Sequence, residues 1–67
     1  MNITMFHIIK PENKTITTHF EGNIETMVRL LKPFLKGHKP RTENGIKKIL
    51  KEEYNDKIKS DIRFRWW

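Results

Sequence analysis

Residues 3–20 read ITMFHIIKPENKTITTHF, and this stretch decides the fold. Residues 3–9 and 14–20 are both rich in β-branched and aromatic side chains, which favour strands. Between them stands Lys10-Pro11-Glu12-Asn13, where proline suits the second position of a turn and asparagine tolerates a left-handed backbone. The stretch therefore predicts a β-hairpin.

A three-residue turn would set the register of this hairpin by pairing Lys10 with Lys14. Ile8 would then lie opposite Ile16, and Phe6 opposite Thr18. Because side chains alternate along a strand, one face is expected to turn toward the core, with Phe6, Ile8, Ile16, Thr18 and Phe20. The opposite face would carry Met5, His7, Ile9, Thr15, Thr17 and His19.

The first helix is expected over about residues 24–36. Asn23 is a good N-cap, and apolar residues recur at helical spacing after it. Pro33 removes a backbone donor inside this pattern, so the helix either kinks there or stops and restarts for one turn. Gly37 is expected to end it.

The second helix is expected over about residues 43–54, with Thr42 as its N-cap. Its wheel is amphipathic, with apolar side chains on one side. The basic side of the same wheel carries Asn44, Lys47, Lys48 and Lys51.

The last run, residues 61–67, alternates apolar and basic side chains with period two, which predicts a strand. Ile62, Phe64 and Trp66 should face the helices, and Arg63, Arg65 and Trp67 the opposite side. The order of elements predicts an α+β fold in which two helices pack on one face of a small three-stranded antiparallel sheet, made of the hairpin and this strand. Residues 1–67 would form a single domain.

The expected core draws on every one of these elements. We expect burial of thirteen side chains: Phe6, Ile8, Ile16, Phe20, Ile24, Met27, Val28, Leu31, Ile46, Ile49, Leu50, Ile62 and Phe64.

Length and cysteine content exclude several classes of protein. A chain of 67 residues has room for one small core, and without cysteine it has neither disulfides nor thiolate metal sites. No apolar run is long enough to span a bilayer, and the first residues do not resemble a signal peptide. A cytoplasmic location is the expectation.

Charge is the strongest functional signal in the sequence. The chain has 14 Lys and Arg against 8 Asp and Glu, for a net charge of +6. Between Arg29 and Lys51 there are eight basic residues and only one acidic residue, Glu43. Such a surface favours a polyanionic partner, because phosphate contacts release condensed counterions.

The leading hypothesis is a small non-enzymatic protein that binds DNA or RNA, or a nucleoprotein complex. Its candidate contacts are Lys39, Arg41, Asn44, Lys47, Lys48 and Lys51. A helix-turn-helix would use the start of the second helix in this way, but the connection from Gly37 to Arg41 is long for that motif.

The uncovered face of the sheet is the second candidate surface, with Met5, His7, Ile9, Arg63, Arg65 and Trp67. Aromatic and arginine side chains there could stack unpaired bases or anchor a protein interface. The alternative hypothesis is therefore a phage- or mobile-element-type regulator. It would inhibit a host protein that has an acidic nucleic-acid-binding cleft. The abundance of Lys, Ile, Thr and Asn is typical of AT-rich genomes such as those of many phages.

Catalysis has little support in the sequence. There is no glycine-rich phosphate loop and only one serine, Ser60. A small ribonuclease using His38 with Lys39 and Arg41 is conceivable, and so is a metal shared by His7 and His19, although no third ligand can be placed. We expect no enzymatic activity, no cofactor and no metal, and the sequence leaves the oligomeric state open.

Overall fold

The computed structural model describes residues 1–66 and contains the expected hairpin with its strands one step out of the expected register. Strand β1 (Asn2–Ile9) runs antiparallel to β2 (Lys14–Glu21), and the connection has four residues rather than three. Asn13 closes this turn with a φ of 56°. Consequently His7 lies opposite Ile16, and the expected pairing of Ile8 with Ile16 is wrong.

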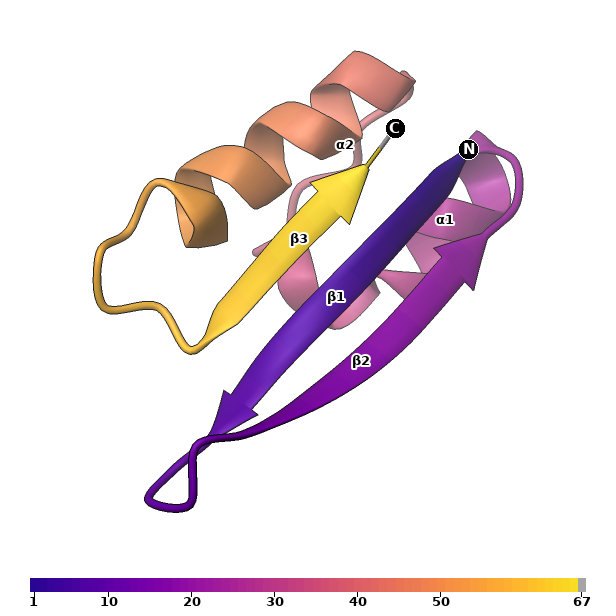
Figure 1. Ribbon diagram of the computed structural model, residues 1–67. Coiled ribbons are helices and arrows are strands. Elements are labelled where there is room, and N and C mark those ends of the chain that lie inside the picture. Colours follow the sequence, from indigo (N-terminus) through magenta and orange to yellow (C-terminus); the bar gives the residue numbers. More distant parts are fainter. Residues whose placement is uncertain (67) are drawn as a thin grey trace.

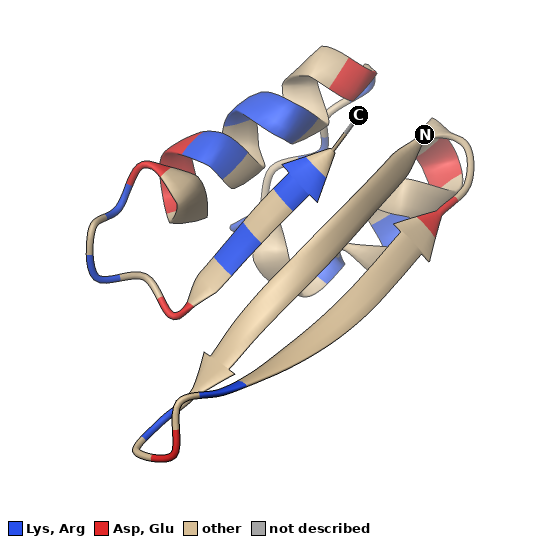
Figure 2. Cartoon of the chain, in the orientation of Figure 1, with Lys and Arg blue, Asp and Glu red and all other residues tan. Residues whose placement is uncertain are grey.

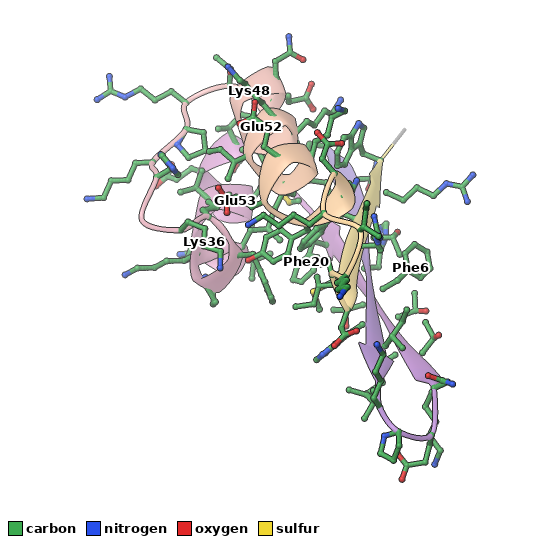
Figure 3. All side chains as sticks on the ribbon, turned by 90° about the vertical axis from the view of Figure 1, so that its left-hand side faces the viewer. Phe6, Phe20, Lys36, Lys48, Glu52 and Glu53 are labelled. Atoms are coloured by element: carbon green, nitrogen blue, oxygen red, sulfur yellow. The ribbon has the colours of Figure 1, made fainter. Side chains whose placement is uncertain are left out.

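The shifted register exchanges the two faces of β1. Ile3 and Met5 are buried beneath the helices, and His7 and Ile9 share their face. Phe6 and Ile8, which we expected in the core, lie on the face turned away from the helices, called the open face below. Figure 3 shows Phe6 and Phe20 pointing to opposite sides of the sheet. A period of two does not choose between the faces of a strand that is apolar on both.

Strand β3 (Ile62–Trp66) pairs antiparallel with β1, which makes β1 the central strand in the order β2-β1-β3. Both helical segments lie on one side of this sheet (Figure 1). The α+β fold with an N-terminal hairpin, a C-terminal strand and two helices is therefore confirmed. The far end of the hairpin extends beyond the helices.

Helix α1 (Ile24–Leu30) is shorter than the expected helix because Pro33 interrupts it. The Asn23 side chain caps it by accepting a hydrogen bond from the backbone N–H of Thr26 at 2.9 Å. The chain restarts as a single 3-10 turn, η1 (Lys32–Phe34), with the proline near its start.

Helix α2 (Glu43–Leu50) begins at Thr42, whose hydroxyl accepts from the Gly45 N–H at 3.0 Å. It continues directly into a wider helical turn, η2 (Lys51–Asn55). This turn carries Tyr54 into the core and ends beside β3, where the Asn55 side chain meets the backbone of Phe64.

The core joins both helices to the inner face of the sheet. Its buried side chains are Ile3, Met5, Met27, Leu31, Leu35, Ile46, Leu50, Tyr54 and Phe64. Phe34, Tyr54 and Phe64 stack edge to face, with ring centroids 5.2–6.1 Å apart. Ile16 lies on the helix side but is 53% exposed, so its expected burial is wrong.

Candidate nucleic-acid interface

A groove runs between α1 and the chain segment that follows η1. It is a cavity of about 400 Å³ lined by Glu25, Val28, Arg29, Lys32, Leu35, Gly37, His38 and Lys39. A second hollow of about 440 Å³ shares Glu25, Val28 and Lys39 with it and extends to Pro40 and Arg41. The two hollows therefore form one continuous depression, called the α1 groove below.

The groove exists because the chain reverses direction after η1. Lys36 and Gly37 both have left-handed backbones, with φ of 53° and 81°, and the His38 N–H donates to the Leu35 carbonyl at 2.9 Å. Glycine tolerates this conformation without strain. The reversal brings residues 38–41 back along α1, so cations from two separate segments meet.

Lys36 is held at this reversal by an aromatic ring. Its Nζ atom lies 5.5 Å from the centroid of the Tyr54 ring, which is a favourable cation–π distance. Burial of Tyr54, together with the negative charge of Glu53, raises the pKa of its hydroxyl above the ordinary value. The end of the first helical segment is thus anchored to η2.

The rim of the α1 groove is strongly basic. Arg29, Lys32, Lys39 and Arg41 surround it, against the single carboxylate of Glu25. Within residues 1–66, none of these four cations forms an ion pair. Figure 2 shows basic segments of α1 and of the chain that follows it behind the sheet, away from the open face. Four uncompensated charges therefore border one depression.

The floor of the groove is aliphatic. Val28 and Leu35 line its deeper part, and Ile24 lines the adjoining hollow. Met27 of α1 and Leu31, which directly follows the helix, are buried in the core, and the helical spacing then leaves Val28 on the groove side. The site therefore combines apolar contact at its base with positive charge at its edges.

The six basic and polar residues expected to form one stripe are divided by the structure. Lys39 and Arg41 belong to the α1 groove, whereas Lys48 lines a separate hollow with Glu52 and Glu53. Figure 3 shows Lys48 of α2 close to Glu52 of η2, the turn that continues the helix. Carboxylates therefore offset the positive charge on this side of the helix.

The other residues that were expected on the second helix are also less available for phosphate contacts than the sequence indicated. Lys51 binds the Asp56 carboxylate through contacts of 3.1 Å. Lys47 is partly buried, and Asn44 lines a third hollow near Met1. Residues 31–42 separate α1 from α2, which is much longer than the turn of a helix-turn-helix.

The sequence-based site omitted two residues that the fold places at its centre, Arg29 and Lys32. Both were counted in the basic cluster, and their spacing of three residues puts them on one side of a helical turn. That spacing was the available signal. Their proximity to Lys39 depends on the chain reversal at Lys36 and Gly37, which no local pattern indicates.

The open face differs from the expected interface. Met5, His7 and Ile9 lie on the helix side, so their assignment to the open face is wrong, because the hairpin register is shifted by one. Phe6 and Ile8 take their places. Arg63 donates to the backbone carbonyls of Asn55 and Ile58, the latter at 3.3 Å, and so stabilises the fold.

Arg65 and Trp67 are the last two residues expected in the open-face interface. Arg65 is exposed on β3 and lies opposite Thr4 on the open face. Trp67 lies outside the described residues. The open face that the structure describes thus carries Phe6, Ile8 and Arg65, in place of the expected surface of Met5, His7, Ile9, Arg63, Arg65 and Trp67.

The two hairpin histidines do not meet. His7 lies on the helix side and His19 on the open face, so their expected common face is wrong. The His19 Nδ1 atom instead lies 3.2 Å from the Thr4 hydroxyl. Among residues 1–66, no cluster of three His, Asp or Glu side chains has the geometry of a metal site.

Comparison with known proteins adds no functional assignment: no family model, curated protein or solved structure matches this chain. In the described part of the chain, no helix is long and apolar enough to cross a membrane. The functional argument therefore rests on the α1 groove itself.

Proposed function

We propose that the protein binds nucleic acid by seating the phosphate backbone on the basic rim of the α1 groove. The observation that carries the proposal is that Arg29, Lys32, Lys39 and Arg41 converge around one depression and have no ion-pair partner in the part of the chain that the structure describes. Cations that are not neutralised by neighbouring carboxylates release bound counterions from a nucleic acid most effectively.

The shape of the groove favours a single strand over a duplex. Val28 and Leu35 offer an apolar floor, which suits the face of an unpaired base or a sugar. A duplex buries its bases in the stack and presents only phosphates to such a concave site. We therefore expect single-stranded DNA or RNA to bind more tightly than a duplex of the same length.

Binding of this kind is governed by charge rather than by sequence. Phosphate contacts fix the position of a ligand but do not read its bases. The lining residues include no asparagine or glutamine, which are the side chains that pair with adenine, so adenine readout has no support at this rim. The affinity should fall steeply with salt and vary little among sequences.

The test is fluorescence anisotropy with labelled single strands and duplexes over a series of salt concentrations. The double variant Arg29→Gln, Lys39→Gln should weaken binding by about tenfold or more and flatten the salt dependence. The matched control is Lys57→Gln, Lys59→Gln, which removes the same charge from the exposed turn before β3. The control should retain nearly wild-type affinity and salt slope.

Two outcomes would overturn the proposal. Equal losses in both double variants would mean that only net charge matters and that the groove is not a site. Absence of binding by the wild type at low salt would favour the competing proposal, a regulator that inhibits a host protein through the open face. Phe6 and Ile8 on that uncovered surface support the competing proposal. Capture of one protein from nuclease-treated host extract, lost in Phe6→Ala, would establish it.

A further inference from the structure

The outer edge of β2 carries a row of backbone groups without partners. The Ile8 N–H donates to the Asp61 carbonyl at 2.8 Å, so even-numbered residues of β1 bond toward β3 and odd-numbered residues toward β2. The register then directs the backbone groups of Thr15, Thr17, His19 and Glu21 away from the sheet. No residue within the described chain bonds to them.

This edge lacks the features that usually prevent strands from pairing. Residues 15–20 read TITTHF and contain no lysine, proline or glycine, while four of the six are β-branched. The strand is eight residues long and pairs with β1 along its whole length without an interruption. Such an edge is a template for another strand.

We propose that β2 pairs antiparallel with β2 of a second copy of this chain, about a twofold axis at Thr18, to form a continuous six-stranded sheet. In this register Thr15 lies opposite the partner's Glu21, and Thr17 opposite the partner's His19. All of the outward backbone groups of residues 15–21 are then paired, through about eight hydrogen bonds.

Side chains on the helix side of the sheet support the same register. Ile16, which is 53% exposed in one copy, comes to lie opposite the partner's Phe20. Aromatic and β-branched residues are favourable cross-strand pairs. An axis at Thr17 would instead place Glu21 opposite the partner's Asn13 in the turn and would leave the strand ends unmatched. The axis at Thr18 uses the whole strand.

Charge also favours a second copy at this edge. The chain has a net charge of +6, but β2 carries only Lys14 at its start and Glu21 at its end. Figure 2 shows this strand uncharged between those two ends. Antiparallel pairing brings the Glu21 end of one copy to the Lys14 end of the other, at both ends of the interface. Each end of the interface then carries one lysine and one glutamate, so neither end adds a net charge where two basic proteins approach.

The other edge of the sheet explains why assembly stops at two copies. The outward backbone groups of Ile62 and Phe64 on β3 are bound by side chains of the same chain: Asn55 holds both groups of Phe64 at 2.7 and 2.8 Å. Ser60 holds both groups of Ile62 in the same way. Within residues 1–66 the β2 edge is thus the longer uncovered one, and a twofold axis closes it. This inference does not depend on nucleic-acid binding.

Single-cysteine cross-linking tests the register, because the protein has no cysteine of its own. Thr18→Cys would face its own symmetry mate in a non-hydrogen-bonded pair, where the Cα atoms lie about 4.5 Å apart, within the range of a disulfide. Mild oxidation should therefore convert this variant into a covalent dimer. The control, Thr17→Cys, faces the partner's His19 and should cross-link much more slowly.

Light scattering over micromolar to submillimolar protein concentrations tests the assembly itself. The wild type should pass from monomer to dimer without larger species, and Ile16→Asp should raise the dimer dissociation constant by about tenfold or more. Thr17→Pro removes only an outward N–H, so it should remain folded by circular dichroism and become monomeric. A wild type that stays monomeric or forms open-ended polymers would overturn the proposal, and so would equal cross-linking of Thr18→Cys and Thr17→Cys.

Discussion

The two edges of the sheet are built in opposite ways. The β3 edge has five residues, and side chains of Asn55 and Ser60 occupy its outward backbone groups at Phe64 and Ile62. The β2 edge has eight residues and no such cover in the described chain. One edge is completed within the molecule, and the other remains able to pair.

The difference follows from how the chain enters and leaves each strand. Residues 56–61 lead from η2 back to β3, so a helical turn and a loop lie beside that edge and supply polar side chains. Strand β2 is followed after two residues by α1, which packs over the face of the sheet. Within residues 1–66, no segment covers the β2 edge. Edge protection is therefore local, and it is set by the connections.

The largest expected contrast between the two edges is in stability. Phe64→Ala should lower the free energy of unfolding by about 3–5 kcal/mol, because it empties a buried site between two aromatic rings. Ile16→Ala in β2 should cost less than about 1 kcal/mol in the monomer, since the side chain is half exposed. Urea denaturation at low protein concentration measures both. Equal losses would mean that β2 is as deeply packed as β3.

A smaller effect is expected from removing the side chain that covers the β3 edge. Asn55→Ala leaves both the N–H and the carbonyl of Phe64 without their partners and should cost about 2 kcal/mol. Hydrogen exchange at the Phe64 amide should accelerate at the same time. Asn44→Ala, on the exposed surface of α2, is the control and should leave both measurements unchanged.

Ser60 should contribute less than Asn55 to the stability of the β3 edge. Its hydroxyl donates to the Ile62 carbonyl at 2.7 Å and accepts from the Ile62 N–H at 3.2 Å. Ser60→Ala should therefore cost about 1 kcal/mol. Thr15→Ala at the open β2 edge removes no such contact, and its unfolding midpoint in urea should match the wild type. A larger loss in Thr15→Ala would mean that the β2 edge has a partner within the monomer.

The smallest effect concerns pH and the helical turn that covers the β3 edge. Burial and the charge of Glu53 raise the pKa of Tyr54, so the folded state holds the phenol proton more tightly than the unfolded state. This contribution is complete below the ordinary tyrosine pKa and is lost as the pH rises through the raised value. The Tyr54→Phe variant should consequently lose less stability than the wild type between neutral and strongly alkaline pH. The fall in the midpoint temperature of thermal unfolding measures this loss. An identical decline in both proteins would contradict this role of the phenol.

The sequence predicted β3 better than β1 for a physical reason. In residues 61–66 apolar side chains alternate with charged ones, so only one face suits a core. In β1 both faces are apolar, with Ile3 and Met5 on one and Phe6 and Ile8 on the other. The length of the turn then decides which face is buried, and Lys10-Pro11-Glu12-Asn13 fits turns of more than one length.

The candidate site was predictable in charge but not in location. The basic run after Arg29 was evident, yet its division between the α1 groove and α2 depends on the chain reversal at Lys36 and Gly37. The two hydrogen bonds of Asn55 could not be predicted from the sequence either. They join residues nine positions apart in the sequence, across the loop between η2 and β3. In the sequence, an asparagine at position 55 indicates only the end of a helix.

The pairing of Ile3 with Trp66 gives the molecule a direction of mechanical weakness. The start of β1 and the end of β3 lie side by side (Figure 1), so a pull applied at residues 2 and 66 would act across the strands. Hydrogen bonds between antiparallel strands lie along that direction and would break one pair after another instead of sharing the load. Extension by optical tweezers should therefore peel β3 away at low force, before the hairpin opens.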